Sequence, residues 1–350
     1  MSEGPAQRVV VLAPNWLGDA VLALPAIGGV RRAFPAAQLA VAARGSVAAV
    51  FRLAPAVDRA IPLRSDARWW RLGAFREDVE ALRGFDVALL LPHSFHSAWL
   101  VKKAGIRERW GYASDLRSPL LTRAVRRVKG GHQAQHYTRL AAALGCEAPD
   151  DVPEVDVSQP SRLAAEALLT EQGRQPGSTV VVLAPGAAYG RAKQWIPAHV
   201  ATLIAELRER GMTCVLVGSA ADARTGREIA RALETRHGGT SNAGARGALI
   251  DLIGKTSIEM LAAVLACADV CVCNDSGAMH LAAAVGTRVV ATFGPTNEHA
   301  TRPLPRPGRR ADVLTNPVWC RPCMLRECPI DHRCMTGLTP DRVLGAVVSP

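Results

Sequence analysis

One hexapeptide occurs twice in this chain, and it constrains the fold more than any other feature. The sequence VVVLAP stands at Val9–Pro14 and again at Val180–Pro185. Each copy is a run of β-branched and apolar residues, which is typical of a buried strand, and a helical pattern follows it. These helical patterns cover Gly18–Ala33 and Ile196–Arg210. We therefore predict two α/β domains that begin in the same way.

Further apolar runs alternate with helical patterns in both halves. This alternation predicts a parallel, doubly wound, Rossmann-like sheet in each half, with ligands bound beyond the carboxyl ends of the strands. The further strands that we expect are Leu39–Ala43, Arg59–Leu63 and Asp86–Leu91 in the first half, and Thr213–Val217, Asp251–Gly254, Val270–Cys273 and Arg288–Phe293 in the second.

The length of 350 residues fits two domains better than one, since single cores stop growing near about 250–300 residues. A stretch rich in Pro, Asp and Ser at Asp150–Ser161 is typical of a linker. We expect a first domain over residues 1–155 and a second over 156–350. The second would end with a Cys-rich segment and a final helix, Pro340–Val348.

The formal net charge of +11 indicates an anionic partner. Much of it falls between Lys102 and Arg139, where ten basic residues face only Glu108 and Asp115. No motif with interleaved aromatic residues accompanies them, so we expect no nucleic acid. A phosphorylated glycolipid at an anionic membrane surface fits this segment, and a solvated surface is the plainer alternative. The basic residues are Lys102, Lys103, Arg107, Arg109, Arg117, Arg123, Arg126, Arg127, Lys129 and Arg139.

No stretch is typical of a membrane span. The most apolar one, Met260–Cys273, is interrupted by Asp269 and is shorter than the about 20 residues that a bilayer needs. The apolar run near the N-terminus fits a first strand better than a signal peptide. We expect a cytoplasmic protein with peripheral contact at the cytoplasmic face of the inner membrane.

Two loops of the first half carry polar residues just after a strand. Asp19 could cap the first helix, or it could act as a general base that takes a proton from a sugar hydroxyl. His93 and Ser94 could hydrogen-bond an acceptor sugar or a phosphate, and a helix cap is the alternative for Ser94. No third ligand lies nearby in the sequence, so we expect no metal there.

Two loops of the second half are suited to phosphate. Gly186 allows close approach of the backbone, and Lys193 is a compact positive charge. In the other loop, Ser276 and Gly277 open a helix whose N–H groups could bind an anion, with Asp275 as a cap or an orienting group. His280 lies one turn further and could be a buried structural residue. Neither a Walker loop nor a G-x-G-x-x-G follows these strands, which argues against a nicotinamide dehydrogenase.

Five of the segments that follow strands are recognisable when taken together. In order, NWLGD, LPHSFHSA, PGAAYGRAKQW, NDSGAMHLAAA and FGPT resemble the ADP-heptose:lipopolysaccharide heptosyltransferases, and the resemblance runs from Val9 to Pro303. Within that family the chain looks most like heptosyltransferase II. The resemblance implies the glycosyltransferase-B fold, with acceptor on the first domain and donor on the second. It also implies inversion at the anomeric carbon without a metal or other cofactor.

The resemblance also implies roles for single residues. Asp19 matches the catalytic base and Lys193 the phosphate-binding lysine. Arg191 departs from the pattern, because related sequences often carry proline there, and we expect the change to affect loop rigidity more than chemistry. Together with the loops themselves, the resemblance predicts donor contacts at Gly186, Lys193, Asp222, Asp275, Ser276, Gly277 and His280, and acceptor contacts at Asn15, His93, Ser94 and Arg123.

The function that these observations favour is transfer of heptose from ADP-L-glycero-D-manno-heptose onto a heptose of the phosphorylated, lipid A-linked lipopolysaccharide core. One alternative is the same transfer onto another acceptor, as in heptosyltransferase I or a later core heptosyltransferase. Others are a nucleotide-sugar epimerase of the same fold and a non-catalytic nucleotide-sugar-binding protein.

Four of the nine cysteines cluster near the C-terminus, at Cys320, Cys323, Cys328 and Cys334, with His332 among them. The thiols could be reduced and structural, which a cytoplasmic location favours, or they could pair as disulfides. The first C-x₂-C also permits zinc or an iron–sulfur cluster, although the usual two close pairs separated by a longer loop are absent.

Overall fold

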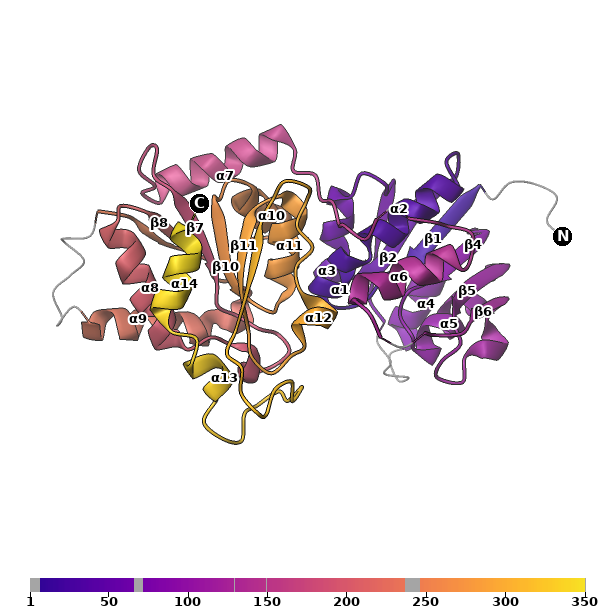
Figure 1. Ribbon diagram of the computed structural model, residues 1–350. Helices are drawn as coiled ribbons and strands as arrows, with labels where there is room; N and C mark the ends of the chain where they lie inside the picture. Colours follow the sequence, from indigo (N-terminus) through magenta and orange to yellow (C-terminus); the bar gives the residue numbers. More distant parts are fainter. Residues whose placement is uncertain (1–6, 66–71, 129, 149, 237–245, 350) are drawn as a thin grey trace. The chain divides into compact units, whose positions relative to one another are not determined.

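A computed structural model describes residues 7–65, 72–128, 130–148, 150–236 and 246–349. The chain divides into two compact units, Met1–Asp156 and Val157–Pro350. Each unit contains one six-stranded sheet in which every pair of neighbouring strands is parallel (Figure 1). The predicted fold class, two Rossmann-like parallel sheets with flanking helices, is confirmed.

In the first unit the strands lie in the order β3-β2-β1-β4-β5-β6, with β1 Arg8–Leu12, β2 Gln38–Arg44, β3 Arg59–Leu63, β4 Val87–Leu90, β5 Glu108–Tyr112 and β6 Arg123–Val125. Helices and 3₁₀ turns connect them. They are α1 Leu17–Leu22, α2 Leu24–Ala33, α3 Gly45–Ala48, η1 Ala49–Leu53, α4 Leu72–Ala81, α5 Phe95–Lys103, η2 Ser118–Leu120 and α6 Gln133–Ala142.

In the second unit the order is β12-β11-β10-β7-β8-β9, with β7 Val180–Ala184, β8 Thr213–Leu216, β9 Leu249–Asp251, β10 Val270–Asn274, β11 Arg288–Phe293 and β12 Ala311–Thr315. The helical elements are α7 Gln159–Glu171, η3 Arg191–Lys193, α8 Pro197–Glu209, η4 Ala220–Asp222, α9 Ala223–Arg236, α10 Ile258–Ala266, α11 Gly277–Val285, α12 Glu298–Thr301, α13 Arg333–Thr336 and α14 Pro340–Val348.

The two copies of the repeated hexapeptide form the corresponding strands β1 and β7. Each is buried between two neighbours, β1 between β2 and β4, and β7 between β10 and β8. In both sheets the direction of winding reverses beside this strand, between β1 and β4 and between β7 and β10. Such a switch point opens a crevice at the carboxyl ends of the strands, where ligands of doubly wound sheets bind.

Some sequence expectations need correction. The helix expected over Gly18–Ala33 is two helices, α1 and α2, and Pro25 stands in the first turn of the second. Proline lacks the N–H of an interior helical residue, but it is tolerated in a first turn. The strand expected at Asp251–Gly254 is wrong, because β9 ends at Asp251 and Gly254 adopts a left-handed turn conformation with φ +73°.

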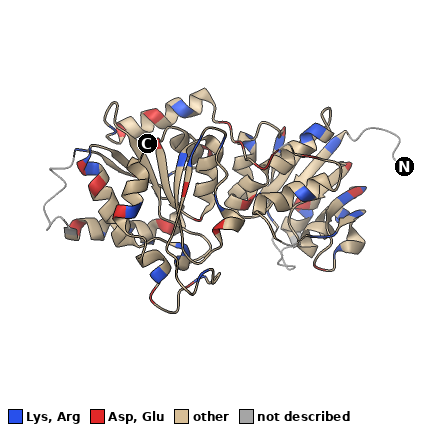
Figure 2. Ribbon diagram, in the orientation of Figure 1, with Lys and Arg blue, Asp and Glu red and all other residues tan. Residues whose placement is uncertain are grey.

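The basic segment is not uniformly a surface. Arg117 is fully buried and donates to the backbone carbonyls of Pro92 and Tyr112, and burial lowers its pKa to about 10. Arg126 and Arg127 are exposed. Figure 2 shows other Lys and Arg residues of the segment on α5, β5 and β6. Lys129 lies outside the described residues.

Among the residues with a described structure, no helix is both long and apolar enough to cross a bilayer.

Candidate active site

Asn274, at the end of β10, ties together the two loops beside the switch point of the second sheet. Its Nδ2 donates to the carbonyl of Pro185 at 2.7 Å, and its Oδ1 accepts the backbone N–H of Trp195 at 2.9 Å. The Thr292 hydroxyl donates to the same Oδ1 at 3.0 Å. A buried amide with these partners fixes the loop after β7 against the end of β10.

This arrangement places Lys193 beside Asp275. The Lys193 Nζ lies 2.6 Å from Asp275 Oδ2, and the two side chains are 14% and 5% exposed. The Thr296 hydroxyl donates to the same carboxylate oxygen at 2.7 Å. Lys193 Nζ also lies 4.9 Å from the centre of the Tyr189 ring. Asp275 therefore holds the lysine in place and does not cap α11, whose N-cap residue is Ser276. This ion pair was not predicted from the sequence.

The first turn of α11 adds hydrogen-bond donors next to this ion pair. Ser276 is the N-cap residue, but its side chain does not cap the helix. Its hydroxyl is buried and has no hydrogen-bond partner within the described part of the chain. Gly277 begins the helix, and His280 is buried one turn later. A helix N-terminus with open donors, next to a lysine, is suited to a phosphate.

Asp222 lies against the loop that follows β7. Its carboxylate accepts the backbone N–H and the hydroxyl of Ser219 at 2.9 and 2.8 Å. A side chain at position 186 would collide with it, because a Cβ built on Gly186 falls 2.3 Å from Asp222 Oδ1. Gly186 is therefore required for this close approach. The structure thus places the expected donor residues after β7, β8 and β10, in loops and in first helical turns, with His280 inside α11.

The Cys-rich segment packs on the loop that carries Lys193. The Tyr189 hydroxyl donates to the carbonyl of Met324 at 2.7 Å, and the Ala192 N–H donates to that of Arg326 at 2.9 Å. The His332 Nε2 lies 2.7 Å from the carbonyl of Ala192. These contacts link the backbone conformation of the two segments.

The four clustered cysteines are free thiols, so the structure does not contain the disulfides considered above. Across the described ranges, which include all four, no three His, Cys, Asp or Glu side chains are placed to hold one metal ion. Cys334 is buried, whereas Cys320, Cys323 and Cys328 are partly or fully exposed. Burial, followed by the neighbouring thiols, raises the pKa of Cys334.

In the first unit, Asp19 lies in the first turn of α1 and is half-buried. The N-cap residue is Trp16, so the alternative that Asp19 caps this helix is wrong. Asp19 Oδ1 accepts a hydrogen bond from the Tyr137 hydroxyl at 3.2 Å, and that hydroxyl accepts one from Gln133 Nε2 at 3.0 Å. Burial and the negative charge of Asp19 hold the pKa of Tyr137 well above its usual value, so the phenol keeps its proton.

His93 and Ser94, which follow β4, differ in what they contact. Ser94 caps α5 by accepting the Ser97 N–H at 3.3 Å, which confirms the helix cap given as its alternative role. Burial, and then the nearby Arg127 and Arg117, lower the pKa of His93 to about 4, so its ring is neutral at physiological pH. Arg123 lies elsewhere, with its guanidinium 4.8 Å above the Trp110 ring.

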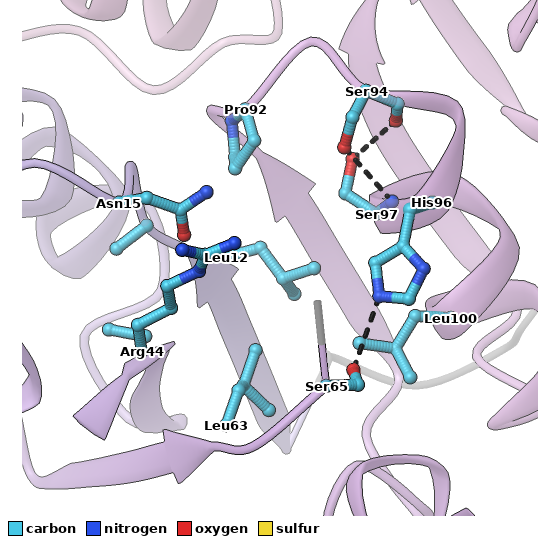
Figure 3. A pocket seen from close by; sticks show the side chains of 12 residues that line it. Leu12, Asn15, Arg44, Leu63, Ser65, Pro92, Ser94, His96, Ser97 and Leu100 are labelled. Atoms are coloured by element: carbon cyan, nitrogen blue, oxygen red, sulfur yellow. Dashed lines mark hydrogen bonds between the residues drawn. The ribbon is translucent and has the colours of Figure 1, made fainter. Parts of the chain in front are cut away.

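A cavity of about 140 Å³ opens at the carboxyl edge of the first sheet (Figure 3). Two residues expected to bind the acceptor, Asn15 and Ser94, line it, whereas His93 and Arg123 do not. Arg44 also lines it and was missed, and so does His96, the second histidine of the loop LPHSFHSA. Arg44 ends β2, so the rule that ligands meet strand ends could have identified it. Nothing in the sequence pointed to the contact of Tyr137 with Asp19.

Comparison with known proteins decides the family. The sequence model of the protein family "Glycosyltransferase family 9 (heptosyltransferase)" matches residues 75–333, which is most of the chain. The chain belongs to glycosyltransferase family 9. It is therefore a glycosyltransferase, as the resemblance implied.

Relatives and solved structures agree with this assignment. The chain is 29% identical to lipopolysaccharide heptosyltransferase 2 of Escherichia coli K12 over 348 residues, covering 96% of both proteins. It is also 29% identical to lipopolysaccharide heptosyltransferase 1 of Pseudomonas aeruginosa over 367 residues, again 96% of both. The structure of E. coli ADP-heptose lps heptosyltransferase II matches with a TM-score of 0.79 at 28% identity, over 97% of each chain.

Proposed function

We propose that this glycosyltransferase transfers heptose from ADP-heptose onto a heptose of the lipopolysaccharide core, as heptosyltransferase II. The observation that carries the proposal is the cluster of Lys193, Asp275 and the open first turn of α11, at the carboxyl edge of the second sheet. The similarity to heptosyltransferase 2 proteins along nearly the whole chain supports the choice of sugar.

The second unit binds the donor in this proposal. Lys193 and the N–H groups at Ser276 and Gly277 stabilise the negative charge that develops on the departing diphosphate, so no metal ion is needed for that role. Asp275 orients Lys193 and does not cancel its use, because an ammonium group has two further N–H donors. Asp222 lies near enough to the same loop to bind the ribose.

The first unit binds the acceptor and supplies the base. Asp19 takes the proton from the attacking heptose hydroxyl, and the freed oxygen bonds to the anomeric carbon of the donor. The bond from that carbon to the diphosphate oxygen breaks, and its electron pair leaves with ADP. Because the hydroxyl oxygen attacks the face opposite the departing diphosphate, the anomeric centre is inverted. The positive end of α1 favours the ionised form of the carboxylate before the reaction.

The lipid-linked acceptor also requires contact with a membrane surface. Arg126 and Arg127 are exposed, and so are two apolar side chains of the same segment, Val128 at 62% and Leu116 at 92%. Basic and apolar side chains together are suited to an anionic bilayer surface. We expect an Arg126→Gln/Arg127→Gln variant to sediment less with vesicles containing anionic lipid, while its activity on a delipidated acceptor is unchanged. Equal sedimentation would remove the patch from the proposal.

The second candidate function is that of heptosyltransferase I, because the similarity to the Pseudomonas aeruginosa enzyme is equally high in identity. The two candidates differ in the acceptor. Purified protein should be given ADP-heptose and cores that end in no, one or two heptoses, and the products separated by mass. The proposal predicts transfer to the core with one heptose. Transfer only to the core without heptose would assign heptosyltransferase I instead.

A further inference from the structure

The cavity of the first unit lies where four neighbouring strands end. Leu12, Arg44 and Leu63 contribute from β1, β2 and β3, and Pro92 follows β4 (Figure 3). This position includes the switch point between β1 and β4. It is therefore the place in this sheet where the fold itself favours a ligand.

The cavity has the chemistry of a site for one sugar unit. Leucine and proline side chains form its apolar walls, which suit the C–H face of a sugar ring. Polar groups stand at its border: the Asn15 amide, the Ser94 hydroxyl, and the Ser65 hydroxyl, which is hydrogen-bonded to His96 Nε2 at 3.1 Å. Mostly apolar lining with a few polar groups that fix orientation is typical of small-ligand sites.

Among the residues that the structure describes, Arg44 is the only Lys, Arg, Asp or Glu that lines the cavity, and it is exposed. Its guanidinium forms no hydrogen bond or ion pair with the part of the chain that the structure describes. The buried carboxylate next to the cavity, Asp78, is already occupied by the backbone N–H groups of Arg64 and Ser65. No ion pair joins Asp78 to Arg44, both of which lie in the described part of the chain.

We propose that this cavity binds an anionic sugar unit of the acceptor, and that Arg44 pairs with the carboxylate or phosphate on that unit. A guanidinium group can bind either anion through two parallel N–H···O bonds, which fixes both position and orientation. The inference rests on the proposed function, because it places the acceptor on the first unit. It goes further in assigning Arg44 as a specificity-determining residue that acts apart from the base Asp19.

The test uses the full-length protein with Arg44→Gln and Arg44→Lys, and Arg59→Gln as the matched control. Arg59 is also exposed, but it begins β3, whereas the cavity lies at the other end of that strand. We expect Arg44→Gln to raise the acceptor KM by about 10–100-fold, as loss of a hydrogen bond to a charged group would. Arg44→Lys should keep part of the affinity, and the donor KM should not change. An acceptor KM for Arg44→Gln equal to that of Arg59→Gln would overturn the proposal.

Two modified acceptors identify the anion. One has its carboxyl groups reduced to alcohols, and the other has been treated with phosphatase. The wild-type protein should lose affinity for the one that lacks the partner group, and Arg44→Gln should not distinguish it from the untreated acceptor. If the wild-type protein binds both modified acceptors as well as the untreated one, the proposal is wrong.

Binding of the delipidated core oligosaccharide by calorimetry separates this inference from the proposed function. If the protein transfers no heptose to any acceptor, the proposed function fails, but the Arg44 effect on binding still decides the cavity proposal. If transfer occurs and Arg44→Gln binds the oligosaccharide like the wild type, only the cavity proposal fails.

Discussion

Asp19 and Tyr137 are 118 residues apart in the chain, yet a hydrogen bond joins them because α1 and α6 pack together. Gln133 donates to the same tyrosine hydroxyl, which directs the tyrosine proton toward the carboxylate. The proposed base is thus oriented by a buried residue that does not itself react.

We predict that Tyr137→Phe shifts the acidic limb of the kcat/KM pH profile to higher pH. The ionised form of Asp19 loses a hydrogen-bond donor, so the carboxylate takes up a proton at a higher pH than in the wild type. Tyr112→Phe is the control, because the Tyr112 hydroxyl donates to the backbone of His136 instead. A limb that stays in place in Tyr137→Phe would show that the tyrosine has only a packing role.

Lys193 yields a prediction about the donor. Lys193→Gln should weaken ADP-heptose binding by about 10-fold or more, because a charged hydrogen bond to phosphate is lost. It should also lower the melting temperature, since Asp275 is left buried without its cationic partner. Lys255→Gln, an exposed lysine of the same unit, serves as the control. Unchanged ADP-heptose affinity, measured by calorimetry, would place Lys193 outside the donor site.

Among the elements of the second unit, the Cys-rich segment supports the loop that carries Lys193 through hydrogen bonds at Tyr189 and Ala192. We predict that thiol reagents modify Cys320, Cys323 and Cys328 before Cys334 in the native protein near neutral pH. Cys334 is buried and its raised pKa leaves less reactive thiolate at that pH. Peptide mapping after timed labelling gives the order. Protection of all four until a chelator is added would instead indicate a bound metal ion.

Much of the architecture could be predicted from the sequence, because buried central strands are continuous apolar runs. Strands β1, β7 and β10 were found on that ground. Strands β5 and β6 were missed, because charged residues such as Glu108 and Arg123 begin them and mask the pattern. Of these two strands only β6 lies at the edge of the sheet, since β5 lies between β4 and β6.

The candidate site was predictable where function depends on a local pattern. Lys193 and Ser276 follow strands in recognisable loops. The partners that position these loops were not predictable, since Asn274 and Pro185 meet only through the pairing of β7 with β10. Tyr137 was missed for the same reason, as its sequence neighbourhood carries no sign of Asp19.

In the whole molecule, we assign the acceptor and the base to one unit and the donor to the other. Each six-stranded sheet provides one switch point, and the residues proposed for chemistry follow strands β1 and β7 beside them, Asp19 in the first turn of α1 and Lys193 in η3. We propose that these side chains suffice for transfer of heptose from ADP-heptose without a metal ion.

The most direct test is a transfer assay with chelator-treated protein, ADP-heptose and a core acceptor that ends in one heptose, followed by mass spectrometry of the acceptor. We predict addition of one heptose and release of an equal amount of ADP, at the rate of the untreated protein. Asp19→Asn, measured in parallel, should be slower by about 10²–10⁴-fold, as expected for loss of a general base. Transfer that stops on chelation and returns with a divalent cation would contradict metal-independent transfer, and an Asp19→Asn rate equal to wild type would contradict the role of Asp19 as the base.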